Sequence, residues 1–374
     1  GQFAFVTKNS VTQGTQIPIY WPYLFSKNLV INFAHTSFKW ANLAAHNAGV
    51  TVVIIGVGKP KEKKFIINEE QYRAVKWINP YLLASEVQIV QTSNTSLSSL
   101  SAMKYGNLPG DGNFLTVSSV ERIGLISDNS ENAKFIKPLY GAQEFIRGQQ
   151  RFCLWIDDDL LDEALKNPFI AKRIQSVYDV RISSKDASYN SLANRPHQFR
   201  DRNLASCLTI LVPIVSSENR EYLPTTVLPG GIVTNNSVCA LYDAPLWNMA
   251  IIASKLHLMW IATVCGQLET RLRYSNTLGW NTFPIPKLTE KNKADLTRCA
   301  EDILLAREAH FPATIADLYD PATMPENLRH AHERNDEVIE RIYIGRRFKN
   351  DTERLEKLFE LYTQMTAPTK ALRG

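Results

Sequence analysis

The apolar run VTVVIIGV, residues 50–57, is the strongest structural signal in the chain. It is continuous rather than alternating, which is typical of a strand buried on both faces of a sheet. A second strand is predicted at Leu29–Ala34. Two strands alone cannot bury so apolar a run. We therefore expect residues 1–64 to be part of a larger sheet, with the missing strands upstream of Gln2 or in the next region, and with a solvated, charged boundary at residues 59–64.

The composition indicates a globular protein with more than one core. The chain has 374 residues, of which 44% are hydrophobic and 21% charged, values that exclude a disordered protein. The formal net charge of +5 is compatible with a polyanionic partner and does not require one. The chain begins with Gly1 and not with Met, and we expect it to be a piece of a longer polypeptide.

Cysteine spacing and hydropathy bear on location. The five cysteines are far apart and include no C-x-x-C pair, so we expect reduced thiols in a cytoplasmic protein instead of a disulfide or zinc framework. The most apolar long stretch, Pro245–Cys265, is interrupted by Asn248, Lys255 and His257. Because a charge inside a membrane span is costly, this stretch predicts a buried helix and no membrane segment.

The expected fold class is α+β, with three regions. The first is the remnant of a sheet in residues 1–64. Residues 65–287 form a mixed α/β region, with strands predicted at Val87–Val90, Phe152–Ile156 and Leu208–Val212, helices at Glu163–Lys166 and Pro245–Cys265, and a turn at Gly106–Gly112. Residues 288–374 form a C-terminal helical bundle, because apolar stripes at helical spacing run over Leu296–Leu304, Leu328–Ile342 and Leu355–Met365, with Gly345 ending the second helix and Asp351 capping the third.

An ordered series of motifs resembles one known family. The stretches are TKNSVTQG (7–14), FAHTSFKW (33–40), VTVVIIG (50–56), GNLPGDGNFL (106–115), KPLYGAQEFIRGQQRFCLWI (137–156), VSSENREYLP (215–224), SKLHLMWIATVCGQLETRLRYSN (254–276) and WNTFPIP (280–286). Together they resemble the MmeI-like (type IIL) DNA methyltransferase and restriction–modification family. The resemblance implies that residues 1–64 are the C-terminal strands of a methyltransferase catalytic domain, residues 65–287 a target recognition domain, and residues 288–374 a C-terminal helical domain.

The resemblance also implies what this chain lacks. Family members carry a glycine-containing S-adenosylmethionine loop and an Asn-Pro-Pro-Tyr/Phe motif, and neither is found here. Asn79-Pro80-Tyr81 lacks the second proline and predicts a turn. We expect no catalytic, cofactor-binding or metal-binding residue in this chain and S-adenosylmethionine in the parent protein. The expected partners are double-stranded DNA and an upstream methyltransferase core of the same polypeptide. The alternatives are a non-catalytic DNA specificity subunit that docks onto a separate modification subunit, and a purely structural helical module.

Two motifs supply candidates for contact with a flipped base and with the DNA backbone. By family resemblance Phe38 or Trp40 lines a pocket for the flipped adenine, although two aromatic rings also cover a sheet edge well. Lys39 between them reaches a phosphate or water. The RYSN run offers Arg273, Ser275 and Asn276, with Arg271 just before it, for phosphate or base contacts. The alternative is that Arg273 and Tyr274 pin the helical tail.

Further candidates lie in polar loops. In VSSENREYLP the residues Ser216, Ser217, Glu218 and Arg220 suit base reading, and a Glu218–Arg220 surface ion pair is the alternative. Lys104 and Asn107 flank the Gly106 turn, and the polar segment Ser183–Asn203 offers Arg195, His197 and Arg200, with a solvated loop as its alternative. The acids Asp157–Asp159 are predicted to cap a helix and not to bind a metal. His330 and His332, two apart, are predicted to be surface histidines.

Overall fold

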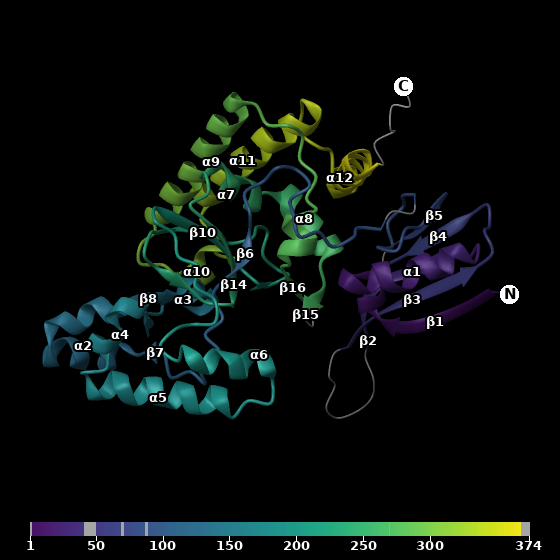
Figure 1. Cartoon of the computed structure of the whole chain (residues 1–374). Helices are drawn as coiled ribbons and strands as arrows, with labels where there is room; N and C mark the ends of the chain where they lie inside the picture. Colours follow the sequence, from purple (N-terminus) through teal and green to yellow (C-terminus); the bar gives the residue numbers. More distant parts are fainter. Residues whose placement is uncertain (1, 41–49, 69–70, 87–88, 269, 368–374) are drawn as a thin grey trace, which may run out of the picture.

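The computed structural model describes residues 2–40, 50–68, 71–86, 89–268 and 270–367. Figure 1 shows a sheet with its helix at the N-terminal side, a middle region of short strands and helices, and a group of longer helices that ends near the sheet. The fold is α+β, as expected.

The apolar run forms β3 (Val50–Gly58), an inner strand of a five-stranded sheet. Its order is β1-β3-β2-β4-β5, in which β2 and β4 are parallel and the other pairs antiparallel. The strands are β1 (Gln2–Lys8), β2 (Val30–Trp40), β3 (Val50–Gly58), β4 (Lys64–Ile67) and β5 (Tyr72–Val75). The two predicted strands are confirmed as β2 and β3. The expectation about the missing neighbours was wrong in one respect, because β1 lies within the chain and pairs with β3 along its whole length.

Helix α1 (Ile17–Ser26) packs on this sheet after two 3-10 turns, η1 (Asn9–Thr12) and η2 (Gly14–Gln16). Ile17 and Trp21 are buried in the core that also holds the inward residues of β3, and the Trp21 indole donates to the Val11 carbonyl at 2.7 Å. The prediction of a fully solvated boundary at residues 59–64 was wrong at one position. Lys64 is only 5% exposed, because its ammonium donates to the carbonyls of Lys61 and Lys76, both at 2.9 Å.

The middle region contains three small sheets, of order β12-β10-β14-β6, β11-β16-β15 and β13-β8-β9-β7. Their strands are β6 (Lys104–Tyr105), β7 (Thr116–Val117), β8 (Ile136–Tyr140), β9 (Phe152–Leu154), β10 (Leu208–Pro213), β11 (Val215–Ser216), β12 (Thr226–Pro229), β13 (Val233–Thr234), β14 (Val238–Tyr242), β15 (Gln267–Leu268) and β16 (Arg271–Arg273). The helices are α2 (Ser119–Asp128), α3 (Ala142–Arg147), α4 (Leu161–Ala164), α5 (Pro168–Ile182), α6 (Ala187–Asn190), α7 (Trp247–Ile252) and α8 (Lys255–Val264), with 3-10 turns η3 (Ser130–Phe135), η4 (Asp158–Leu160) and η5 (Ser191–Asn194) and one π-helical turn, η6 (Asn276–Trp280).

Several predictions for this region are confirmed and two were wrong. Strands β9 and β10 and helix α4 lie at or beside the predicted positions. The stretch Pro245–Cys265 forms two helices instead of one, because Ser254 breaks the run and caps α8 by accepting from the His257 amide at 3.2 Å. Of the strand predicted at Val87–Val90, Ile89 and Val90 are not in a strand, and residues 87–88 lie outside the described residues.

The helical region confirms the three predicted stripes as α9 (Glu290–Glu308), α11 (Glu326–Ile344) and α12 (Asp351–Thr366), with a short α10 (Ile315–Leu318) between the first two. Gly345 ends α11 at φ 74°. The predicted cap of α12 was off by one residue, because the Asn350 side chain accepts from the Glu353 amide at 3.0 Å. His332 is fully buried, so its prediction as a surface residue was wrong, whereas His330 is exposed.

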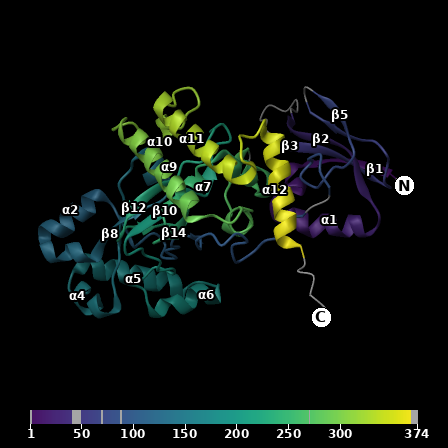
Figure 2. The ribbon, with the colours of Figure 1, turned by 90° about the horizontal axis from the view of Figure 1, so that it is seen from above.

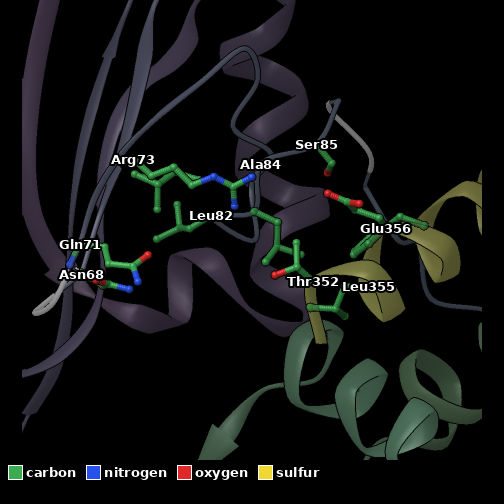
Figure 3. Close-up of a pocket in the computed structure, with 12 residues that line it drawn as sticks. Asn68, Gln71, Arg73, Leu82, Ala84, Ser85, Thr352, Leu355 and Glu356 are labelled. Carbon is green, nitrogen blue, oxygen red and sulfur yellow. Dashed lines mark hydrogen bonds between the residues drawn. The ribbon is translucent and has the colours of Figure 1, made fainter. Parts of the chain in front are cut away.

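One hydrophobic core runs from the sheet through the middle region into α12, and a second fills the lobe of α2 and α5. The Phe359 ring of α12 lies 5.2 Å from that of Trp260 in α8 and 5.4 Å from that of Tyr81, and the Tyr362 hydroxyl accepts from the Gln91 amide at 3.2 Å. Figure 2 shows α12 standing between the sheet and the rest of the molecule. A cavity of about 290 Å³ remains where β5, the turn at Leu82 and the start of α12 meet (Figure 3).

The chain enters and leaves the middle region at the same place. The Leu97 amide donates to the Asn281 carbonyl at 2.7 Å, and the Ser93 amide donates to the Thr277 carbonyl at 3.0 Å. The Ser98 hydroxyl donates to the Phe283 carbonyl at 2.6 Å. The entry segment, residues 93–98, therefore runs beside the exit segment, residues 277–285.

Candidate DNA interface

Two motifs that are far apart in the sequence are hydrogen-bonded neighbours. Strands β11 and β16 pair antiparallel, with Val215 opposite Arg273 and Ser216 opposite Leu272. The Tyr274 amide extends the ladder by donating to the Ile214 carbonyl at 2.7 Å. The structure thus brings VSSENREYLP and RYSN together on one small sheet.

This sheet presents basic side chains to the solvent. Along β16, Arg271 and Arg273 are exposed and Leu272 between them is buried, as alternation in a strand requires. Lys104 on β6 is also exposed, and its ammonium donates to the Asn203 side chain at 3.0 Å. Next to it, Tyr105 has a pKa raised mainly by partial burial and lowered in part by a hydrogen bond to Ser275 and by the charge of Arg273. The side chains of Tyr105 and Ser275 are therefore adjacent.

The end of the RYSN run holds the local backbone. The Ser275 hydroxyl caps η6 by accepting from the Leu278 amide at 3.2 Å, and the Asn276 amide group donates to the Met103 carbonyl at 3.2 Å. Tyr274 is buried, and its hydroxyl lies 2.8 Å from Nε2 of His257. Tyr274 therefore pins α8 of the middle region, which differs from the predicted alternative of pinning the helical tail.

In the loop after β11 some polar side chains are exposed and others form hydrogen bonds within the loop. Ser216 is buried, and its hydroxyl accepts from the Arg220 guanidinium at 3.3 Å. The Ser217 hydroxyl accepts from the Asn219 amide at 3.3 Å, which tightens the turn. Glu218 is exposed. The Arg220 guanidinium is half-buried, and burial lowers its pKa although the nearby Asp320 charge opposes this.

Three side chains that were predicted to contact DNA form hydrogen bonds within the protein instead. Asn107 is fully buried, with its amide group donating to the carbonyls of Asn203 and Thr234 and its oxygen accepting from the Asn203 amide at 2.6 Å. His197 is 4% exposed, with Nε2 2.8 Å from the Asp158 carboxylate. The Arg195 guanidinium donates to backbone carbonyls of its own loop. These contacts assign the three side chains structural roles.

The segment Ser183–Asn203 is also ordered by a residue that the sequence did not suggest. Arg181 is fully buried at the end of α5 and donates to the five backbone carbonyls of Pro109, Gly110, Leu192, Arg195 and Gln198 at 2.7–3.1 Å. It thereby ties the glycine turn to the polar segment. Arg200 stays partly exposed above the Tyr189 ring, 5.9 Å from its centroid.

The aromatic pair predicted to face a flipped base lies at the end of β2. The Phe38 and Trp40 centroids are 6.2 Å apart, and Trp40 is 45% exposed. His35 contacts the edge of Phe38 with centroids 4.6 Å apart. The side chain of Lys39 lies outside the described residues.

The remaining motifs have structural roles. Asn79 is buried, and its side-chain oxygen accepts from the amides of Tyr81 and Leu83 at 2.9 and 3.0 Å, which confirms a turn. Asp157 pairs with Arg202, and the Asp158 carboxylate binds His197. As predicted, Asp157 stands at the N-cap position of η4 and Asp158 and Asp159 lie in its first turn, although Asp157 makes no side-chain cap hydrogen bond.

Two further features, a metal-binding cluster and a membrane-spanning helix, are absent from the described part of the chain. Nowhere in it do three or more histidine, cysteine or carboxylate side chains gather as a metal ion would require. No helix in those residues is both long and apolar enough to cross a membrane.

Comparison with known proteins gives these surfaces a context. Residues 60–287 match the family model of the MmeI target recognition domain, residues 1–68 that of the MmeI DNA-methyltransferase domain, and residues 288–369 that of the MmeI C-terminal domain. DNA methyltransferase A of Bacillus subtilis (strain 168) is 40% identical over 365 residues, which cover 97% of this chain and 41% of that protein. The structure of the type IIL restriction-modification enzyme MmeI in complex with DNA superposes with a TM-score of 0.91 at 33% identity and covers 98% of this chain and 50% of that one.

These matches define a class, namely proteins that combine methyltransferase-related strands with a target recognition domain. The chain belongs to the MmeI family, as the motif series indicated. It spans half or less of the length of the two relatives, 41% of one and 50% of the other.

Proposed function

We propose that this chain is the sequence-specific DNA-recognition portion of an S-adenosylmethionine-dependent adenine-N6 DNA methyltransferase. One observation carries the proposal: VSSENREYLP and RYSN meet on one sheet whose exposed side includes Arg271 and Arg273. Exposed arginines suit phosphate contacts that position a duplex, and Glu218 and Arg220 in the adjoining loop suit cytosine and guanine edges. The relative solved in complex with DNA supports DNA as the partner, and we propose that it is double-stranded.

In this proposal Phe38 and Trp40 receive the adenine that is turned out of the duplex. Their rings lie together at the strand end, and Trp40 is 45% exposed, which suits stacking against a base. In this proposal the methyl donor binds outside this chain, which carries neither a glycine-containing donor loop nor an Asn-Pro-Pro-Tyr/Phe motif. The glycines of β3 are used in packing, because a Cβ on Gly56 would lie 2.0 Å from the Phe33 ring and one on Gly58 would lie 3.2 Å from Gln2. We therefore assign donor binding and methyl transfer to polypeptide outside this chain.

A methyltransferase core joined to β1 is the second partner in the proposal. Strand β1 is the last strand at its edge of the sheet, and Phe3 and Val6 on it are 46% and 51% exposed. Tyr20 and Tyr23 on the outer face of α1 are also exposed. An open, apolar strand edge favours pairing with further strands. Four of the five cysteines are buried free thiols, which supports a cytoplasmic location.

The test is duplex binding by the chain at several salt concentrations, measured by fluorescence anisotropy. Each phosphate contact contributes about 0.9 to the slope of log affinity against log salt. Replacing Arg271 and Arg273 together by Gln should make that slope shallower, reducing its magnitude by about 1–2.

The matched control removes two positive charges elsewhere. Lys291 and Arg298 both pair with Asp295 on the outer surface of α9. Replacing these two by Gln should leave the slope unchanged. Binding without salt dependence, or equal losses in the two double variants, would refute the proposed interface.

A further inference from the structure

The loop that holds the proposed base-reading residues is attached to the helical region. We call residues 217–222 the reading loop. The Glu221 carboxylate forms an ion pair with the Arg329 guanidinium of α11. Tyr222 is 1% exposed, and its hydroxyl donates to the Asp336 carboxylate of α11 at 3.1 Å. Two successive loop residues are therefore bound to one helix of another region.

The residues around Tyr222 form a fixed framework. Its ring stacks on His332 with centroids 4.2 Å apart and planes 21° apart. Nδ1 of His332 faces the Ala253 carbonyl at 3.2 Å and so carries the proton, which leaves Nε2 to accept from the Tyr319 hydroxyl at 2.9 Å. The second Asp336 oxygen accepts from the Lys255 amide at the start of α8, at 2.8 Å. Helices α8 and α11 and the residue after α10 thus enclose the end of the loop.

The other end of the loop is attached as well. Ser216 belongs to β11, which is paired with β16. Glu218 and Asn219 are exposed between these two attachments. Hydrogen-bond readout of a base requires placement to within about 0.5 Å. A shift of either attachment by more than this tolerance would carry the exposed residues with it, because Glu218 and Asn219 lie only two or three residues from each attachment.

We propose that Arg329 and Asp336 are positioning residues for sequence selectivity, so that the helical region sets which bases the reading loop accepts. This inference rests on the proposed function. In this arrangement the helical region acts through Glu221 and Tyr222. Selectivity is then shared between two regions that are far apart in the sequence.

The Glu221–Arg329 pair is the part of the framework to perturb. Its side chains are 35% and 29% exposed, so the pair contributes little to folding and its removal leaves the protein folded. The variants are Glu221→Gln, Arg329→Gln, Arg329→Lys and the charge exchange Glu221→Arg with Arg329→Glu. The matched control is Arg334→Gln, because Arg334 lies on the same helix and pairs with Asp302 of α9 at 3.5 Å, away from the loop.

The readout is base preference, measured by selection of bound duplexes from a randomised pool with each protein, alongside the thermal midpoint. For Glu221→Gln and Arg329→Gln we expect discrimination at one or two base pairs to fall at least about fivefold, because one base contact accounts for about that much or more. Total affinity for the pool should change by less than about threefold. The charge exchange and Arg329→Lys should restore the preference, and Arg334→Gln should match the unmodified protein.

Each other outcome overturns the inference in a distinguishable way. If the unmodified chain selects no sequence, the proposed function fails and the inference with it. If it selects a sequence and Arg329→Gln selects the same one equally sharply, only the inference fails. If Arg334→Gln loses preference to the same degree, or the charge exchange restores nothing while the thermal midpoint drops, the effect is general destabilisation and not positioning.

Discussion

Replacing Asp336 by Asn removes a carboxyl group that the fold buries. Asp336 is 6% exposed, and its oxygens accept from the Lys255 amide and the Tyr222 hydroxyl. Burial raises its pKa from 3.8 to about 7, helped by the charge of Glu340 and opposed by the Lys255 charge and the two hydrogen bonds. Asn fills the same space and keeps an oxygen for the Lys255 amide.

The sign of the effect follows from which state holds the proton. Between pH 3.8 and about 7 the folded protein keeps a proton on Asp336 that the unfolded chain has released, so its contribution to stability falls as pH rises through this window. One pKa unit corresponds to about 1.4 kcal/mol, so the two units from pH 5 to pH 7 correspond to about 3 kcal/mol. Between pH 5 and pH 8 the Asp336→Asn protein should therefore gain about 3 kcal/mol relative to the unmodified protein.

The assay is urea unfolding of both proteins at pH 5, 6, 7 and 8. The comparison cancels groups that the two proteins share. His257 and His332, whose burial lowers their pKa to about 3, act in the opposite direction. Their contribution to the stability of the protein decreases as pH falls below 6.5. Asp302→Asn, on the solvent side of α9, is the control and should show a constant difference. A constant difference for Asp336→Asn would refute the reasoning, since it would mean that the hydrogen bonds outweigh burial and keep the carboxylate charged.

Three other predictions follow from packing and from the proposed division of labour. Gly106→Ala should destabilise the fold by about 1–3 kcal/mol in urea unfolding, because its Cβ would lie 2.0 Å from the Asn235 carbonyl oxygen; Gly124→Ala, with no atom within 4 Å on α2, should instead stabilise by about 0.5–1 kcal/mol, and equal effects would contradict this account. Phe359→Ala should cost about 3–5 kcal/mol, because the ring fills the contact between α8 and the Tyr81 loop; a loss below about 1 kcal/mol would show that α12 is not part of the main core. Calorimetry should detect no binding of S-adenosylmethionine to this chain, and clear one-to-one binding would overturn the assignment of donor binding to other polypeptide.

Periodicity made the framework predictable. The continuous apolar run could only be an inner strand, and the stripes of α9, α11 and α12 follow the helical repeat. Strand β1 was missed because its apolar stretch is only four residues long, Phe3–Val6, and as an edge strand it exposes most of its residues. His332 was misplaced, although its spacing of four from Leu328 puts it on the buried stripe of α11.

Polar residues were harder to interpret because a sequence does not show where their hydrogen bonds go. Asn107 and His197 resemble surface contacts by residue type, yet both bind within the protein. Arg181 sits in a helix without any pattern around it, and only the fold reveals the carbonyls that surround it. Arg271 and Arg273, in contrast, are exposed, because they alternate with a buried leucine along β16, a strand that was not predicted from the sequence. Their contact with DNA stays a prediction.

The entry and exit segments of the middle region lie side by side, and this has a consequence for the evolution of such a protein. Residues 93–98 and 277–285 cross from one part to the other as a single hydrogen-bonded seam. Because these two segments lie side by side, the number of residues between them does not change the distance between the sheet and α12. A homologous exchange with both breakpoints inside this seam would transplant the proposed reading loop and would leave the Tyr81–Phe359 contact in place. The incoming loop would still have to fit Arg329 and Asp336 of the resident α11. On the proposed function, the seam is thus a junction at which target specificity changes when the incoming loop also fits the resident α11.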